Sequence, residues 1–238
     1  MRCTCCGTCC RNGPPGLHPE DSPLYFEGVL QREHLLTLRR GERVRDNVAG
    51  AVVVLQREMI RIKSRSDSLA CMLLKSENHC PIYERRPAQC RALACWDTDE
   101  LKRVYRQQSL SRSDLISPHS ALAGIIGEHE QGCSPDRLRQ LVQQVREKGD
   151  REGLQEIGLM LSRDREFRRY LRDRAGAEGA LEFILGRSLE AILWAEGIRV
   201  EESGGGYRLR EDRLERAGAP GPNGVAIYPE RTDYENRF

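Results

Sequence analysis

Residues 3–10 read Cys3-Thr4-Cys5-Cys6-Gly7-Thr8-Cys9-Cys10 and hold five of the ten cysteines in this 238-residue chain. Cys3, Cys6 and Cys9 follow C-x2-C-x2-C spacing, and Gly7 permits the positive φ of a tight turn between them. Three thiolates at this spacing, together with one remote cysteine, are the usual ligands of a [4Fe–4S] cluster. The same short loops also bind tetrahedral zinc. The stretch therefore predicts a metal–thiolate site and leaves the metal open.

A second block of cysteines begins some 60 residues later and comprises Cys71, Cys80, Cys90 and Cys95. Leaving Cys5 aside, the eight cysteines of the two blocks suffice for two four-thiolate sites or for one polynuclear site. Either arrangement closes a long loop, but the entropic cost of closure grows only logarithmically with length. Metal–thiolate binding can contribute about 10 kcal/mol or more. Buried or bridged cysteines without a metal are the alternative.

Three cysteines need separate treatment. Adjacent side chains generally cannot reach one ion without strain, so we expect Cys10 to face a second site or to act as a structural or redox thiol. Cys5 and Cys133 stand outside both groups of four, and we expect them to be buried or bridged thiols without a metal.

The overall composition narrows the function classes. The 38 basic and 36 acidic residues leave a net charge of +2, which gives no electrostatic reason to expect nucleic acid or a membrane surface as a partner. No apolar run reaches the length of a membrane span, and no signal-peptide core precedes the first cysteines. We therefore expect a cytoplasmic protein, where clustered cysteines are more often metal-binding or catalytic than bridged. A protein partner or substrate is expected, but its identity is not readable.

Hydrophobic periodicity predicts short strands first and helices later. Strands are expected at 35–38 and 53–62, followed by a hairpin over 71–82 with a cysteine on each arm. Pro87 suits the start of a short helix that carries Cys90. Helices are then expected at 113–130, 135–148, 152–174 and 178–196, followed by a hairpin of residues 198–202 and 207–210.

These elements predict an α+β fold. A small irregular Cys-rich metal-binding domain with short strands (1–132) is followed by a helical domain with a terminal hairpin (133–211) and a flexible tail (212–238). The boundary is placed where the cysteine-rich sequence gives way to helical periodicity.

Residues 80–95 read Cys-Pro-Ile-Tyr-Glu-Arg-Arg-Pro-Ala-Gln-Cys-Arg-Ala-Leu-Ala-Cys. Together with the double-cysteine ending of residues 3–10 and with Cys71, this run resembles the YkgJ family, whose CxxCxxCC domain is associated with zinc or iron chelation. The resemblance covers about residues 1–100, and Met72 departs from the proline that the family often has there.

The resemblance implies one set of metal ligands, consisting of Cys3, Cys6, Cys9, Cys10, Cys71, Cys80, Cys90 and Cys95. It leaves iron–sulfur and zinc both open as the cofactor. A flagellin lysine methylase carries a similar cysteine domain. An iron–sulfur-dependent protein-modifying or redox enzyme is therefore the alternative to a metal-binding protein without catalysis, and no catalytic residue can be assigned.

Other residues are weaker candidates. Arg86 and Arg91 could offset the negative charge of a thiolate centre. His18 could approach the cluster, and His79 could substitute for a neighbouring cysteine as a ligand. His129 and Cys133 lie one helical turn apart and could form an extra ligand pair, but an ordinary surface helix end is the favoured interpretation.

Overall fold

The computed structural model describes residues 3–46, 48–203 and 206–211. The helices are α1 (Thr8–Arg11), α2 (Ser22–Phe26), α3 (Ala88–Ala92), α4 (Asp99–Tyr105), α5 (Arg112–Leu115), α6 (Ala121–Gly132), α7 (Pro135–Lys148), α8 (Arg151–Ala175), α9 (Leu181–Ile184) and α10 (Leu189–Ala195). The strands are β1 (Leu35–Leu38), β2 (Arg43–Asp46), β3 (Ala51–Val54), β4 (Met59–Ile62), β5 (Ile198–Ser203) and β6 (Gly206–Glu211). The predicted α+β class is confirmed, with short antiparallel strand pairs among the cysteines and longer helices after residue 110. The tail predicted for residues 212–238 lies outside the described residues.

The central strand pair joins β1 to β4 in antiparallel register, from Leu35 opposite Ile62 to Leu38 opposite Met59. Alternate side chains of β4 are buried, as expected for a strand with one face on the core, whereas three of the four residues of β1 are buried. The strand expected over 53–62 is in fact two strands. β3 pairs with β2, and the chain then turns at the polar residues 56–58 before β4 begins.

The proline-rich loop after the first cysteines lies along β4. The Leu17 N–H donates to the carbonyl of Ile60 (2.9 Å), and the Ile62 N–H donates to the carbonyl of Pro15 (3.1 Å). Pro15 contributes only its carbonyl to this pairing, so its missing N–H costs nothing here. These bonds fix the loop that leads back to the cysteines against the central strand pair.

Two predicted helices are broken in the structure. The helix expected over 113–130 separates into α5 and α6, because Pro118 disfavours helical backbone at the residue before it. The helix expected over 178–196 separates into α9 and α10 around Gly186, which has a φ of 70°. A Cβ at Gly186 would come within 3.0 Å of the carbonyl oxygen of Thr37, so this turn also sets how closely α9 approaches β1.

The long helices and the terminal hairpin agree with the prediction. Ser134 caps α7 through its hydroxyl, and Gly149 ends that helix in the left-handed conformation. α8 follows within one residue of its predicted ends. β5 and β6 pair from Ile198 opposite Glu211.

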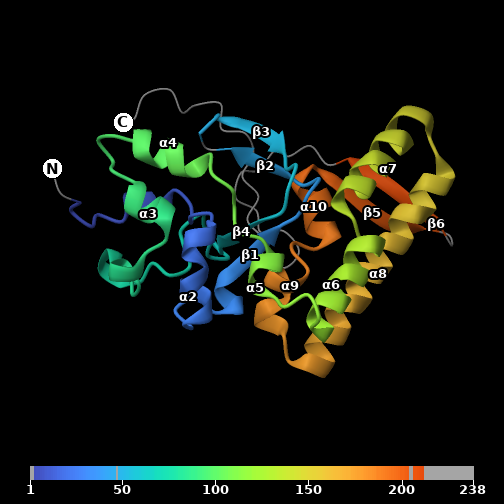
Figure 1. The fold of residues 1–238 in the computed structure, drawn as a ribbon. Helices are drawn as coiled ribbons and strands as arrows, with labels where there is room; N and C mark the ends of the chain where they lie inside the picture. The colour runs from blue at the N-terminus through green and yellow to red at the C-terminus, as the bar shows by residue number, and fades with distance from the viewer. Residues whose placement is uncertain (1–2, 47, 204–205, 212–238) are drawn as a thin grey trace.

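Two apolar clusters form the core. One gathers side chains from the strand pair and from the later helices, including Leu35, Ile60, Leu115, Leu171 and Phe183. The other lies between α7, α8, α10 and β5. Figure 1 shows the cysteine-bearing segments at one end, the β1–β4 pair in the middle and α6, α7 and α8 at the other end. The first cluster crosses the predicted boundary at residue 132, and the division into domains stays a prediction.

Across the described ranges, none of the helices combines the length and the apolar character needed to cross a bilayer.

Candidate metal centre

The first cysteine block turns into a short helix at Gly7. Gly7 has a φ of 74°, and Cys9 and Cys10 follow in α1. Arg11 fastens this turn, because its Nη1 donates to the carbonyl of Cys6 (2.9 Å) and its Nη2 donates to the side chain of Asn78. The first block is thereby attached to the segment just before Cys80.

Replacing Gly7 by Ala tests that attachment. An added Cβ would lie 2.7 Å from Oδ1 of Asn78, in addition to the backbone strain of about 1–2 kcal/mol that a left-handed residue carries. We expect Gly7→Ala to release metal to a competing chelator more readily than the wild-type protein. Gly28→Ala is the matched control, since Gly28 has a φ of 72° and nothing within 4 Å of its Cβ position. Equal metal retention in both variants would contradict the assigned role of the Gly7–Asn78 contact.

The second block does not form the predicted hairpin. Cys71 makes an isolated antiparallel bridge with Ser64, and short 3-10 turns at Ser76–Asn78 and Tyr83–Arg85 carry the chain past Cys80. The hairpin prediction over 71–82 was therefore wrong. The backbone N–H of Cys71 donates to the carbonyl of Cys10 (2.7 Å), which connects the two blocks directly.

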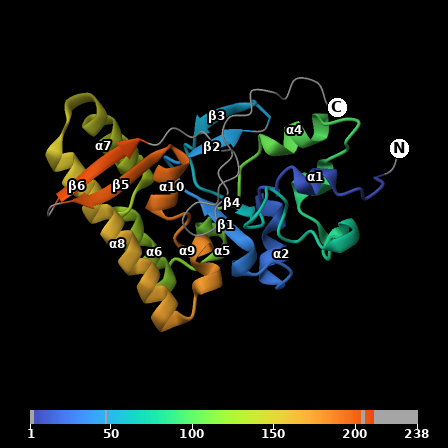
Figure 2. The same ribbon diagram turned by 180° about the vertical axis from the view of Figure 1, so that it is seen from behind.

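α3 begins after Pro87 and carries Cys90, as predicted, and a tight turn closed by Ala94 and Asp97 follows at Cys95. Figure 2 labels α1, and Figure 1 labels α3, at the same cysteine-bearing end of the molecule.

A buried carboxylate holds the start of α3. Asp21 accepts hydrogen bonds from the backbone N–H of Ala88 (2.8 Å) and from the backbone N–H of His18 (2.9 Å). Burial raises the pKa of Asp21, and these two hydrogen bonds oppose the rise. Both ring nitrogens of His18 are engaged, one with the carbonyl of Gln108 and the other with the side chain of Gln89. His18 therefore supports α3 and is not free to act as a metal ligand.

Replacing Asp21 by Ala should loosen α3 and with it Cys90. The change leaves two backbone N–H groups without their acceptor, at about 1–3 kcal/mol for each buried group. We expect a lower free energy of unfolding in urea and weaker metal retention. Glu20→Ala is the control, because Glu20 is exposed and only forms a surface ion pair with Arg91. If both variants retained metal and stability alike, the capping role of Asp21 would be wrong.

The eight predicted ligands lie at one end of the molecule with graded exposure. Cys71 is buried, and Cys9, Cys10, Cys80 and Cys90 are half-buried, whereas Cys3, Cys6 and Cys95 are exposed. All ten cysteines are free thiols. Among the described residues, no three of the eight sulfurs lie within 4.8 Å of one another, so binding of one ion by several of them requires a local contraction.

Cys9 and Cys10 have sulfurs 3.9 Å apart. Two sulfurs bound to one tetrahedral zinc at about 2.3 Å each are separated by about 3.8 Å. Whether Cys10 faces a second site, or is a structural or redox thiol, stays a prediction. The adjacent pair has a separation that fits a shared ion.

Electrostatic interactions connect the eight thiols into one continuous group. The hydrogen bond from Cys10, aided by the charge of Arg86, lowers the pKa of Cys9 to about 6. Burial raises the pKa of Cys90, and negative charge at Cys71, Cys9 and Cys80 raises it further. Burial likewise raises the pKa of Cys95, followed by the charges of Cys9, Cys6 and Cys3. The charge of Cys9 raises the pKa of both Cys90 and Cys95, so thiols of the first block influence the protonation of thiols in the second block.

The comparison with protein families agrees with this chemistry. Residues 2–109 match a family model described as "CxxCxxCC: Putative zinc- or iron-chelating domain". Residues 2–109 are therefore similar to this family, and we refer to them as the CxxCxxCC domain. No curated protein and no solved structure matched the chain. The match confirms the resemblance seen in the cysteine spacing and ends just before α5, so the long helices lie outside it.

Two residues of the CxxCxxCC domain lie directly beside the thiols. The guanidinium of Arg86 stacks on the ring of Tyr83, 4.1 Å from the ring centroid. Hydrogen bonds with Cys5 and then Cys3 raise the pKa of Tyr83 to about 12. Arg86 therefore lies close enough to the thiols to offset their negative charge, as predicted from the sequence. Arg91 instead pairs with Glu20 (3.3 Å) and donates to the backbone of Arg86.

The remaining candidates fall outside the CxxCxxCC domain or at its surface. His79 is exposed beside Cys80. His129 and Cys133 are completely buried, so the prediction of a surface helix end there was wrong. Burial, together with the charge of Asp164, raises the pKa of Cys133 to about 12. The partner Asp164 is 35 residues further along the chain than His129, and no local sequence pattern indicates it.

Proposed function

We propose that the CxxCxxCC domain binds metal through the thiolates of Cys3, Cys6, Cys9, Cys10, Cys71, Cys80, Cys90 and Cys95, either at two four-thiolate sites or at one polynuclear site. The C-x2-C-x2-C spacing fits both an iron–sulfur cluster, which we propose as the occupant, and zinc, which is the alternative. The observation that carries the proposal is the Cys9–Cys10 pair, whose sulfurs lie 3.9 Å apart and whose backbone is bonded to Cys71 of the second block.

The donor set fits such a group. Thiolates are soft ligands that select zinc and iron–sulfur clusters over hard cations. Arg86 provides positive charge beside Cys9, which favours the thiolate form that binds metal. An iron–sulfur cluster, when bound, supplies one-electron chemistry. A reducing compartment such as the cytoplasm, where thiols stay unpaired, suits this site.

The exposure of three of the eight thiols favours a second candidate function. Cys3, Cys6 and Cys95 face solvent, so a small molecule or a protein side chain can approach the centre from that side. An iron–sulfur-dependent protein-modifying or redox enzyme needs such an open face, whereas a structural site is closed by four protein ligands. A change in the absorption spectrum of the reconstituted centre on adding cyanide or a small thiol would favour the enzyme.

Two cysteine variants test the ligand assignment. We expect Cys90→Ser to lose most of the bound metal, because serine cannot supply a thiolate and α3 holds this position close to the other block. Cys5→Ser is the control, since Cys5 lies in the first cysteine block but is not one of the eight assigned ligands. Metal per chain is measured by elemental analysis on anaerobically purified protein. Full retention by Cys90→Ser, or equal loss in both variants, would contradict the assignment.

A further inference from the structure

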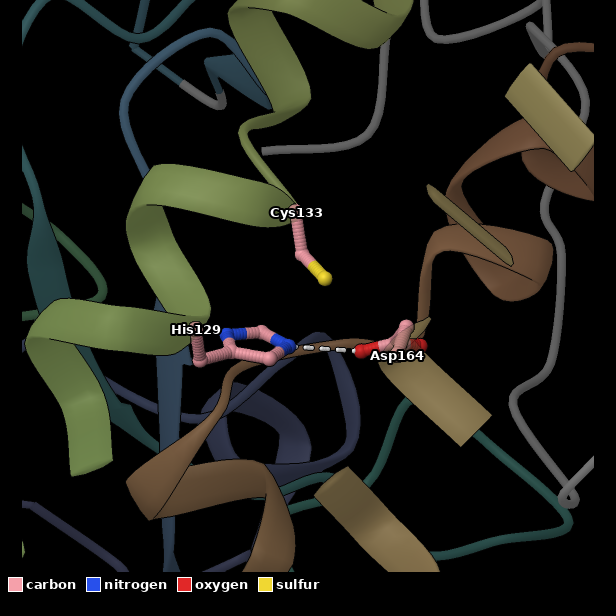
Figure 3. A group of neighbouring side chains, drawn as sticks. All are labelled: His129, Cys133 and Asp164. Carbon is pink, nitrogen blue, oxygen red and sulfur yellow. Dashed lines mark hydrogen bonds and ion pairs between the residues drawn. The ribbon is translucent and has the colours of Figure 1, made fainter. Parts of the chain in front are cut away.

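A second group of metal-ligating side chains lies in the core, far from the cysteine blocks in sequence. His129 belongs to α6, Cys133 is the residue that ends α6, and Asp164 belongs to α8. One ligand atom from each residue lies within 4.8 Å of the others, and the exposed fractions are 0%, 0% and 2%. Figure 3 shows the thiol and the carboxylate converging on the same side of the imidazole.

One buried atom of this group, Nδ1 of His129, has no hydrogen-bond partner. Nε2 of His129 bonds to Oδ1 of Asp164 (2.7 Å), but Nδ1 is buried and has no hydrogen-bond partner. A buried polar atom without a partner costs about 1–3 kcal/mol. The Asp164 carboxylate can only accept a hydrogen bond, so in the present structure Nε2 of His129 carries the ring proton and Nδ1 carries the lone pair. An ion bound at Nε2 would take the place of this hydrogen bond, and the ring proton would then reside on Nδ1, which no protein group blocks.

The carboxylate is held in place independently of His129. Asp164 also accepts hydrogen bonds from Nε of Arg168 (3.0 Å) and from the backbone N–H of Leu189 (3.1 Å). Metal-binding carboxylates typically have such additional hydrogen bonds, which orient them for the ion. Asp164 is therefore positioned by α8 and α10 before any ion binds.

We propose that His129, Cys133 and Asp164 bind a single zinc ion, forming a second centre that is separate from the eight-cysteine site. One nitrogen, one sulfur and one oxygen donor suit this borderline-soft cation. The thiolate and the carboxylate together neutralise its two positive charges. Zinc bonds of about 2.0–2.3 Å place ligand atoms about 3–4 Å apart, so only a small contraction of the present group is needed.

The surroundings assign this ion a structural role. The carbonyl of Met160 accepts a hydrogen bond from the thiol of Cys133 at 3.8 Å and offers a fourth, oxygen ligand. The ligands are buried, so a substrate cannot approach them. An ion here would clamp the end of α6 to the middle of α8. The backbone carbonyl of Cys133 also accepts a hydrogen bond from Nη1 of Arg39, the residue that follows β1 (2.9 Å).

Zinc counting on the full-length chain tests the proposal. Cys133→Ser and His129→Gln are nearly isosteric changes, and we expect each to lower the bound zinc by one equivalent per chain. The iron, sulfide or zinc of the N-terminal centre should stay unchanged. Met160→Leu is the control, because it alters the same buried cluster and leaves the Met160 carbonyl in place. Zinc content equal to wild type in both ligand variants would overturn the proposal.

A measurement on the wild-type protein remains decisive if these variants fail to fold. Alkylation of the native protein with iodoacetamide should modify the accessible cysteines of the N-terminal block and empty that centre, while buried Cys133 stays unmodified. Native mass spectrometry should then find one zinc ion per chain, with peptide mapping confirming which cysteines were alkylated. If the alkylated protein is folded and carries no zinc, the proposed zinc site at His129, Cys133 and Asp164 is wrong. That result does not affect the proposed eight-cysteine site.

Discussion

Protein stripped of its metal under anaerobic, reducing conditions is expected to release residues 3–11 and the segment around Cys80 from the rest of the fold. Within residues 3–10 only Gly7 is buried, so apolar contacts contribute little to holding this segment in place. Metal–thiolate binding can contribute about 10 kcal/mol or more, which makes the ion the main source of order there.

Hydrogen exchange measures this effect segment by segment. Amides of residues 3–11 and 76–90 should lose their protection when the metal is removed. Amides of β1 and β4 should stay protected, because Leu35, Ile60 and Ile62 are buried in the first core cluster whether or not the metal is present. Unchanged protection of residues 3–11 in the stripped protein would mean that the protein orders this loop without the metal.

Arg112→Met is expected to lower the free energy of unfolding by about 3–5 kcal/mol, because it breaks a buried ion cluster. Arg112 is 4% exposed and binds Glu58 in the approach to β4, Glu130 on α6 and the carbonyl of Ile184 at the end of α9. Burial alone would lower the pKa of Arg112, but the two carboxylates outweigh that effect and raise it. The substitution leaves both carboxylates without their shared cation.

Urea denaturation of Arg112→Met is compared with that of Arg103→Met. Arg103 pairs with Glu100 on the surface of α4, where both side chains are at least half exposed, so its loss should cost at most about 1 kcal/mol. Similar losses of stability in the two variants would show that the buried cluster does not join the cysteine-bearing half to the helices.

Helices and strands that are defined by neighbouring residues could be predicted from the sequence. Ser134 and Gly149 mark the two ends of α7, and the short apolar run Leu35–Leu38 marks β1. The cysteine spacing was enough to identify the CxxCxxCC domain. Pro118 indicates in the sequence that α5 and α6 are separate helices. The helical periodicity on either side of it nevertheless predicts one continuous helix, which the structure does not contain.

The contacts that position the candidate sites join residues far apart in the chain. Asp21 caps α3 across 67 residues, Arg112 reaches Glu58 across 54, and His129 meets Asp164 across 35. No periodicity or capping rule identifies such partners, since each pairing depends on how the elements pack. The Cys71–Ile82 hairpin was wrong for a related reason, because Asn78 adopts a positive φ and bonds to Arg11 instead of turning a strand back.

The most direct test of the central claim is elemental and sulfide analysis of the full-length chain after anaerobic purification, combined with its absorption spectrum. We expect iron together with acid-labile sulfide and broad visible absorption, all lost in Cys90→Ser. If the protein instead contained stoichiometric zinc and no sulfide, the thiolate centre would still be supported, but its occupant would be zinc and not an iron–sulfur cluster. Protein that is folded, contains neither iron nor zinc at its N-terminal cysteines and has those thiols paired in disulfides would contradict the account.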